Sequence, residues 1–326
     1  MLDFFKLIRY KNLLIIAITQ YLMRYCIVNP ILRISGFELQ LDHFHFVLLV
    51  LSSVLITAAG YVINDYFDTK TDMLNRPDTV LVGINISRRQ AMAIHILLNI
   101  LGVGTGFYLS IKVGIFAIGL AYFLASGVLW FYSTTYKRQF LIGNLIVAVF
   151  TAMVPFIVVV FEVPLLNRVY REVLLQHNMN FNIILAWVGG FAIFAFLATL
   201  IREIIKDIED FEGDMAFGRN TLPVVLGIKT TKTIVVAIII VNVVLLIYVY
   251  LRYLLWMVNG RLDYITLLYF LICIVIPFIY LAFQTIRADT RVHYHRASNL
   301  TKLIMLSGVL YSVVAFFIIN YTFQPA

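Results

Sequence analysis

The chain has 326 residues, of which 62% are hydrophobic and only 13% are charged. Average soluble proteins carry about 25% charged residues, so this composition excludes a soluble globular protein. It predicts an all-α, multi-pass membrane bundle, because the bilayer core admits only helices and closed barrels. A net charge of +8 would suggest a nucleic-acid partner in a soluble protein. In a membrane protein, the excess of Lys and Arg on the cytoplasmic side of the membrane explains this net charge. No nucleic-acid partner is therefore expected.

Nine apolar runs of membrane-spanning length follow one another along the chain. They predict a single membrane-embedded domain over residues 1–326. Residues 1–10 contain no cleavable signal, so the first run is expected to stay in the bilayer as a helix. The nine predicted spans are 12–32, 44–63, 91–110, 114–133, 141–161, 183–201, 232–251, 263–283 and 301–320.

The distribution of basic residues predicts the orientation. Eighteen of the twenty-five Lys and Arg fall on one side of the predicted membrane, and the positive-inside rule identifies that side as cytoplasmic. The N-terminus and the cap loops after the second and sixth spans are therefore expected in the cytoplasm. The C-terminus is expected outside, and the membrane is expected to be the plasma membrane of the cell.

Acidic residues gather in two stretches, and ten of the seventeen lie within residues 65–78 or 203–214. The first stretch follows the second span. Its Asn64, Asp68 and Asp72 are spaced i, i+4, i+8, which places them on one helical face. Carboxylates stacked in this way repel one another. Mg²⁺ would relieve the repulsion, because it takes oxygen ligands from carboxylates and from substrate phosphates.

The second stretch follows the sixth span, and its Asp207, Asp210 and Asp214 are spaced i, i+3, i+7. This spacing again predicts one helical face. Both stretches are expected on the same side of the membrane, where they can meet.

A weak internal repeat supports that meeting. Asp68 and Asp72 recur as Asp210 and Asp214, 142 residues later. The repeat predicts two halves of four spans each, about 44–161 and 183–320, with a site between their acidic ends.

Two facing carboxylate clusters suit Mg²⁺ ions that bind a diphosphate from both sides and neutralise its charge as it leaves. The bundle interior beneath them is apolar and suits a long hydrocarbon tail. A prenyl diphosphate has this division of polarity. The nearby cations that can bind its phosphate oxygens are Lys70, Arg76, Lys137, Arg138, Lys206 and Arg219.

Two other interpretations fit the acidic stretches less well. A single acidic helix end is usually solvated surface, but two such ends on the same membrane side fit that interpretation poorly. A cation-coupled transporter is the alternative from another class of function. Transporter sites, however, lie near the bilayer midplane, whereas these acids lie at span ends.

The motifs resemble those of a known family. Asn64-x-x-x-Asp68-x-x-x-Asp72 with Asn75-Arg76-Pro77, and Asp210-x-x-x-Asp214-x-x-x-Gly218, resemble the two aspartate-rich signatures of UbiA-type intramembrane prenyltransferases. Tyr132-Ser133 with Tyr136-Lys137-Arg138 after the fourth span, and Gly143-Asn144 at the start of the fifth, extend the resemblance over most of the chain.

The resemblance implies Mg²⁺-dependent transfer of a prenyl group from its diphosphate to a lipophilic acceptor. It implies that Tyr132 shields an allylic carbocation. It also implies a set of residues that bind Mg²⁺ and the diphosphate. These are Asn64, Asp68, Asp72, Asp210 and Asp214, with Asp65 and Asp207 in support.

Within the family, the segment 202–214 with Thr221-Leu222-Pro223 most resembles the digeranylgeranylglyceryl phosphate synthases. This resemblance implies a geranylgeranyl donor and geranylgeranylglyceryl phosphate as the acceptor. An aromatic acceptor of quinone or tetrapyrrole biosynthesis is the alternative. Asp78-Thr79-Val80 departs from the more basic or proline-rich continuation expected after the first motif.

Overall fold

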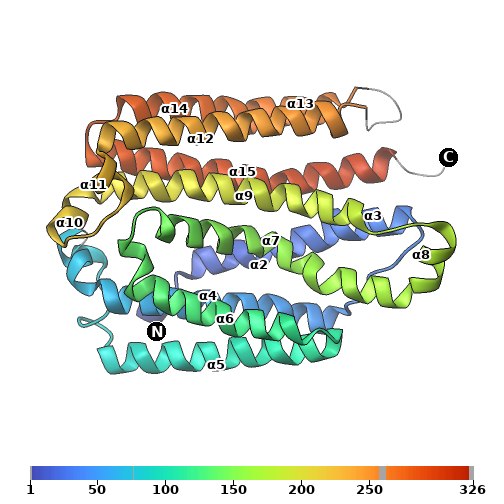
Figure 1. The fold of residues 1–326 in the computed structure, drawn as a ribbon, viewed down its shortest axis with the longest axis horizontal. Helices are drawn as coiled ribbons and strands as arrows, with labels where there is room; N and C mark the ends of the chain where they lie inside the picture. The colour runs from blue at the N-terminus through green and yellow to red at the C-terminus, as the bar shows by residue number, and fades with distance from the viewer. Residues whose placement is uncertain (1, 76, 257–261, 323–326) are drawn as a thin grey trace.

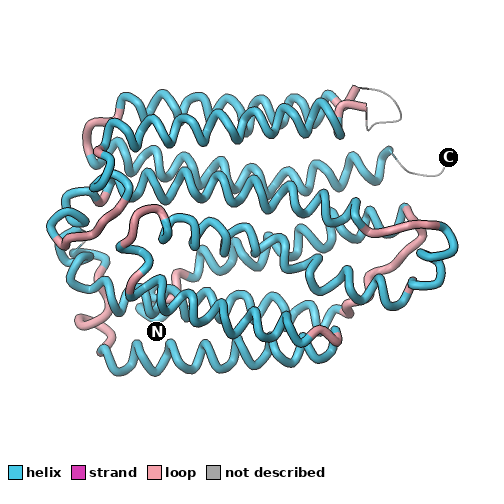
Figure 2. Tube along the Cα trace, in the orientation of Figure 1, coloured by secondary structure: helices cyan, strands magenta, loops and turns pink. Residues whose placement is uncertain are grey.

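The computed structural model describes residues 2–75, 77–256 and 262–322, and within them the chain is a bundle of long helices lying side by side (Figure 1). These residues form no β-strand, and Val82 and Ile86 make an isolated bridge. Figure 2 shows that short loops join the helices at the two ends of the bundle. The elements are α1 (Leu2–Leu7), α2 (Tyr10–Leu22), η1 (Met23–Val28), α3 (Asn29–Ile34), α4 (His43–Asn75), η2 (Pro77–Thr79), α5 (Arg88–Val113), α6 (Phe116–Thr134), η3 (Tyr136–Arg138), α7 (Ile142–Val169), α8 (Arg171–His177), α9 (Asn182–Glu209), α10 (Phe211–Ala216), α11 (Leu222–Leu226), α12 (Ile228–Val249), η4 (Tyr250–Leu254), α13 (Tyr264–Phe270), η5 (Leu271–Val275), α14 (Ile276–Arg287) and α15 (Arg291–Thr322).

Nine helical segments in the described part of the chain are long and apolar enough to cross a membrane, which confirms the nine predicted spans. The second and sixth spans continue beyond their apolar runs, to Met73 and Glu209. The first acidic stretch is therefore an extension of a membrane helix. The segments after these spans are also partly helical, because η2 follows α4 and both α10 and α11 follow α9.

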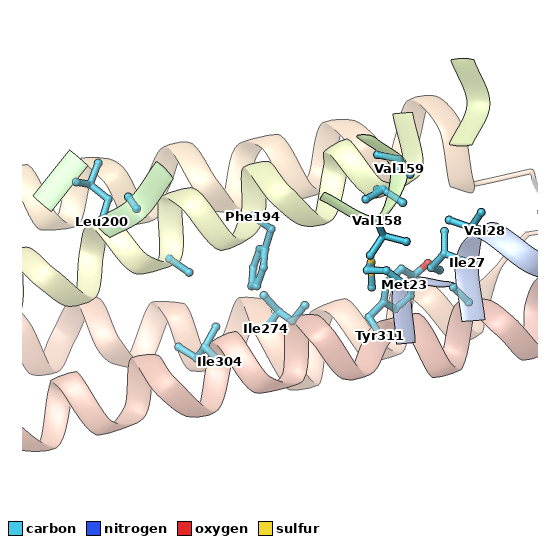
Figure 3. Packing of buried hydrophobic residues seen from close by; sticks show 14 of the residues in the cluster. Met23, Ile27, Val28, Val158, Val159, Phe194, Leu200, Ile274, Ile304 and Tyr311 are labelled. Carbon is cyan, nitrogen blue, oxygen red and sulfur yellow. The ribbon is translucent and has the colours of Figure 1, made fainter. Parts of the chain in front are cut away.

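The core of the bundle forms around α9, which packs against α7, α12 and α15. Phe194 of α9 is buried and points toward the last two spans, where Ile274 and Ile304 lie (Figure 3). A Cβ added at Gly308 of α15 would come within 2.0 Å of the Phe194 ring. Glycine at this position thus lets α15 lie directly against α9. Large apolar side chains such as Leu97 and Phe317 are exposed, as expected for surfaces that face lipid.

A buried ion pair closes the end of the bundle at which α4 begins. The side chains of Arg24 and Glu162 are 3% and 1% exposed, and Arg24 Nη1 lies 3.6 Å from Glu162 Oε2. Glu162 also accepts hydrogen bonds from the backbone N–H groups of Gln40 and Leu41. The Arg24 guanidinium lies 4.4 Å above the Phe46 ring. Removing either charge would leave the other buried without an opposite charge, which typically costs about 3–5 kcal/mol.

Candidate active site

Both acidic stretches lie at the opposite end of the bundle, where α4 ends, η3 turns and α10 begins (Figure 1). We call this the site end. Asp68 is its centre and is buried. Its Oδ1 atom lies 2.7 Å from Lys137 Nζ and 2.8 Å from Arg219 Nη2. Lys137 also donates a hydrogen bond of 3.3 Å to Asn64 Oδ1, one turn back along α4.

Arg219 joins the two acidic stretches. Its Nη1 atom lies 3.3 Å from Asp214 Oδ1, and its Nη2 atom donates to Asp68 and to Thr71 Oγ1 at 2.8 Å. One guanidinium thus contacts α4 and α10 at once, with carboxylates on two of its edges. Residues more than 140 positions apart in the sequence are brought within the span of one side chain.

The other predicted acidic residues have separate partners. Asp65 Oδ1 accepts a hydrogen bond of 2.8 Å from Arg9 Nη2, and Asp207 Oδ2 accepts one of 2.8 Å from Asn144 Nδ2. Asp72 lies half-buried one turn beyond Asp68.

Asp210 differs from the sequence prediction in one respect. It lies between α9 and α10, so Asp207, Asp210 and Asp214 do not share one continuous helix. Asp210 turns instead toward α15, where Arg291 Nη2 lies 3.4 Å from its Oδ1 atom. The break between the two helices lets neighbouring acids face different partners.

Three of the remaining predicted substrate-binding residues lie on α4, α6 and α9. Lys206 is 3.2 Å from Glu203 Oε2 on the same helix, and Tyr132 is half-buried on α6. Lys70 is exposed on α4. Arg76 lies outside the described residues.

Burial shapes the electrostatics of the site end. It raises the pKa of Asp214 to about 6, with the charge of Asp210 adding to the effect and the Arg219 guanidinium opposing it. Burial likewise lowers the pKa of Lys137, and the carboxylate of Asp68 opposes that change. A carboxyl group in such surroundings remains fully ionised only when more positive charge is near it.

The donor chemistry at the site end fits a hard divalent cation. Lys137 contacts oxygens of both Asn64 and Asp68, and Arg219 contacts oxygens of both Asp68 and Asp214. Amide and carboxylate oxygens of this kind are the ligands that Mg²⁺ takes. Across residues 2–75, 77–256 and 262–322, no three Asp, Glu, His or Cys side chains form a ready-made ligand group. Arg219 lies between the carboxylates of Asp68 and Asp214, and Lys137 lies between Asp68 and the side-chain amide of Asn64.

The turn that carries Lys137 is held by close backbone packing. A Cβ added at Gly143 would lie 2.8 Å from the Cα atom of Lys137 and 3.1 Å from the carbonyl oxygen of Tyr136. Leu141, which precedes α7, has a φ of 60°, a conformation that costs a non-glycine residue energy. The N–H of Asn220 donates to the carbonyl of Arg138 at 2.9 Å, so the segment after α10 is fastened to the same turn.

We predict that Gly143→Ala displaces this turn and moves Lys137 away from Asp68. The added methyl group meets backbone atoms, which cannot rotate away as a side chain can. We expect a stability loss of about 1–3 kcal/mol. We also expect a fall in kcat of up to about a hundredfold, because a displacement of about 1 Å at a catalytic site has that effect. Thermal unfolding in detergent and steady-state kinetics measure the two effects.

Gly127→Ala is the matched control, because no atom lies within 4 Å of a Cβ added at Gly127 in α6. Alanine also favours a helix more than glycine does, so this variant should be at least as stable as the parent. Equal behaviour of the two variants would contradict the proposed role of Gly143.

Several contributors to the site end were not identified from the sequence. In the sequence, Arg9 and Arg291 are two of the eighteen basic residues that predict the orientation, and Thr71 belongs to neither of the recognised motifs. Asn144 was noted only as part of the family resemblance, without a partner. The one available signal was the position of Asn144 in the first turn of a span, where a buried amide requires a hydrogen-bonding partner.

Known proteins are similar to this chain in sequence over most of its length. A sequence model of the UbiA prenyltransferase family matches residues 36–303. A digeranylgeranylglyceryl phosphate synthase of Methanosphaera stadtmanae is 31% identical over 266 residues, which cover 80% of this chain and 83% of the relative.

Two solved structures show the fold. A structure described for digeranylgeranylglyceryl phosphate synthase has a TM-score of 0.62 at 23% identity and covers 96% of this chain and 98% of its own. A UbiA homologue from Archaeoglobus fulgidus, solved with GPP and Mg²⁺, has a TM-score of 0.55 at 17% identity and covers 96% of this chain and 99% of its own.

Proposed function

The chain belongs to the UbiA prenyltransferase family, and we propose that it transfers a geranylgeranyl group from its diphosphate to geranylgeranylglyceryl phosphate. The relatives it matches over most of their length bear the name of that activity. The segment 202–214 with Thr221-Leu222-Pro223 supports the same acceptor.

The contact of Arg219 with both Asp68 and Asp214 is the observation that carries the proposal. A diphosphate needs oxygen ligands for its metal ions on two sides and cations for its own oxygens. The site end provides both within one cluster. In our proposal this cluster lies between the two halves of the bundle, about 44–161 and 183–320.

We propose that Asn64, Asp68, Asp72, Asp210 and Asp214 hold Mg²⁺ with the diphosphate, supported by Asp65 and Asp207. When bound, Mg²⁺ would neutralise the charge that develops on the leaving diphosphate. We propose that Lys137 and Arg219 donate hydrogen bonds to phosphate oxygens, and that Lys70, Arg76 and Lys206 are further substrate-binding cations.

In the proposed reaction, the bond between C1 of the donor and its phosphate oxygen breaks, and the electron pair leaves with the diphosphate. Tyr132 is proposed to stabilise the allylic cation through its ring face. The free hydroxyl oxygen of the acceptor forms an ether bond to C1, and its proton is released to the departing diphosphate. Excluding water from the site would prevent hydrolysis of the cation.

We further propose that the site end faces the cytoplasm, with the N-terminus inside the cell and the C-terminus outside it. Eighteen of twenty-five Lys and Arg on the predicted inner side support this orientation. The plasma membrane is the proposed location, and the proposed partners are the bilayer, the prenyl diphosphate and the lipid acceptor.

A product assay tests the proposal. Purified protein is incubated with geranylgeranyl diphosphate, Mg²⁺ and either geranylgeranylglyceryl phosphate or an aromatic acid, and the products are identified by mass spectrometry. We expect the doubly prenylated glycerol phosphate. Prenylation of the aromatic acid alone would replace the proposed acceptor, and diphosphate release without either product would exclude both acceptors.

A further inference from the structure

The helix face that carries Asn64 and Asp68 continues inward from the site end. At spacings of three or four residues, the next positions on this face of α4 are Gly60, Thr57 and Ser53. All three are small and half-buried. The hydroxyls of Thr57 and Ser53 donate to carbonyls of their own helix, at 2.8 and 3.1 Å, so this face presents little polarity to its surroundings.

This face of α4 looks into the bundle and not toward lipid. A Cβ added at Gly60 would lie 3.2 Å from the Leu129 side chain of α6. Ser53, two turns further inward, meets Gln20 of α2. Protein interiors are normally close-packed, so a side chain that faces other helices and is still half-buried borders space that protein atoms do not fill.

The side chain of Gln20 bridges three helices in this part of the bundle. It is fully buried, and its Nε2 atom donates to Ser53 Oγ of α4 at 2.9 Å and to the Val154 carbonyl of α7 at 3.3 Å. The Oε1 atom of the same amide is buried without a hydrogen-bond partner. We call Gln20, Ser53 and Val154 the amide bridge.

The packing of the three helices changes at the amide bridge. One turn toward the site end, they carry small, half-buried residues, which are Ala17, Thr57 and Thr151. One turn beyond the bridge, they carry apolar residues that are at most 2% exposed, which are Met23, Leu49 and Val158. Figure 3 shows Met23 and Val158 within the buried group at that end. The interior is therefore filled beyond the bridge and less filled between the bridge and the site end.

The amide bridge lies at the depth that a geranylgeranyl chain reaches. Ser53 is fifteen residues inward from Asp68 on the continuous helix α4, a rise of about 22 Å at 1.5 Å per residue. The sixteen-carbon main chain of a geranylgeranyl group extends about 19 Å, because each bond of about 1.5 Å advances an extended chain by about 1.25 Å. One more isoprene unit would add about 5 Å, and the chain would then meet the bridge.

Resting on the function proposed above, we propose that Gln20 ends the space for the hydrocarbon chain of the donor and makes geranylgeranyl the longest chain that the site accepts. Moving the amide aside to admit a longer chain would break two hydrogen bonds and leave more buried polar atoms without partners, which is costly. A side chain held on two sides therefore limits the space more firmly than an apolar side chain that can rotate.

A purely structural role for the amide bridge leads to a different expectation. Buried amides hold membrane helices together through interhelical hydrogen bonds. If that were the whole role of Gln20, its replacement would change the stability and leave the choice of donor unaltered. The choice of donor is therefore the measurement that separates the two roles.

Gln20→Ala tests the proposal. The value of kcat/KM is measured with donor diphosphates of three, four and five isoprene units. The parent protein should use the four-unit donor at least about tenfold better than the five-unit donor, since a misfit of one methylene in an apolar pocket already costs about 10–200-fold. Gln20→Ala should raise the five-to-four ratio about tenfold and leave the three-to-four ratio unchanged. Thr19→Ala is the matched control and should change neither ratio, because the buried hydroxyl of Thr19 donates to the Ile15 carbonyl of its own helix.

Ala17→Leu tests the same proposal in the opposite direction. Ala17 lies three residues from Gln20 toward the site end, so a larger side chain there would shorten the space by about 4.5 Å, close to one isoprene unit. We expect the three-to-four ratio to rise about tenfold. Thermal unfolding in detergent verifies that each variant is folded, and Ala17→Leu decides the question if Gln20→Ala does not fold.

The outcomes distinguish this proposal from the function on which it rests. A parent protein that prenylates no acceptor would overturn both. If it prenylates only an aromatic acid, the proposed acceptor is overturned, and the donor ratios measured with that acid still decide the role of Gln20. Equal use of the four-unit and five-unit donors by the parent protein, or unchanged ratios in the folded variants, would overturn the role of Gln20 alone.

Discussion

Replacing Asp68 with asparagine is expected to lower kcat for diphosphate release by about a thousandfold, the upper range for losing one electrostatic contributor to a transition state. Asp68 is the residue on which Lys137 and Arg219 both converge, at 2.7 and 2.8 Å. Asparagine keeps the shape of the side chain but removes its charge. The variant would lose a proposed metal ligand and the anion that positions both phosphate-binding cations.

Asp289→Asn is the control for this experiment. The side chain of Asp289 is 84% exposed, and its ion pair with Lys232 is long, at 3.8 Å. We expect kcat to stay within about twofold of the parent value, because exposed pairs of this kind contribute little. Retention of more than a tenth of the parent kcat by a folded Asp68→Asn protein would remove Asp68 from the reaction centre.

Removal of divalent cations is expected to abolish turnover. Treatment with EDTA should reduce diphosphate release to background, and Mg²⁺ added in excess should restore it. The reason is charge: a diphosphate brought beside several carboxylates is repelled unless dications lie between them. Ca²⁺ should restore the rate poorly, because it is larger and prefers six to eight ligands. Release of diphosphate is followed continuously by a coupled assay.

The thermal stability of the protein in EDTA is the control for the removal of metal ions. The contacts of Arg219 with Asp68, Thr71 and Asp214 are made by protein groups alone. The unfolding temperature in detergent should therefore change little on addition of EDTA. An undiminished rate in EDTA, with metal analysis confirming removal, would overturn the proposed magnesium requirement.

The nine spans were predictable from the sequence because each is a long apolar run, and the bilayer leaves such a run few alternatives to a helix. The spacing of Asn64, Asp68 and Asp72 likewise follows from helix geometry, and α4 keeps all three on one continuous helix. Local periodicity was sufficient for both predictions.

Partners across the bundle were not predictable in the same way. Asp210 and Asp214 look equivalent in the sequence, yet the break between α9 and α10 turns Asp210 toward Arg291 and leaves Asp214 with Arg219. Lys137 reaches Asp68 only because Gly143 permits a backbone contact with the preceding turn. Such arrangements depend on tertiary packing, which no single stretch of sequence records.

The Arg24–Glu162 pair makes the two ends of the molecule respond differently to their surroundings. Its side chains are 3% and 1% exposed, whereas the side chains of Arg9 and Arg291 at the site end are 41% and 45% exposed. Dissolved ions screen pairs that water reaches and hardly affect pairs that it does not. Raising the ionic strength should therefore weaken the outer pairs of Arg9 and Arg291 while the buried Arg24–Glu162 pair persists. We expect high salt to lower the activity well before it unfolds the protein.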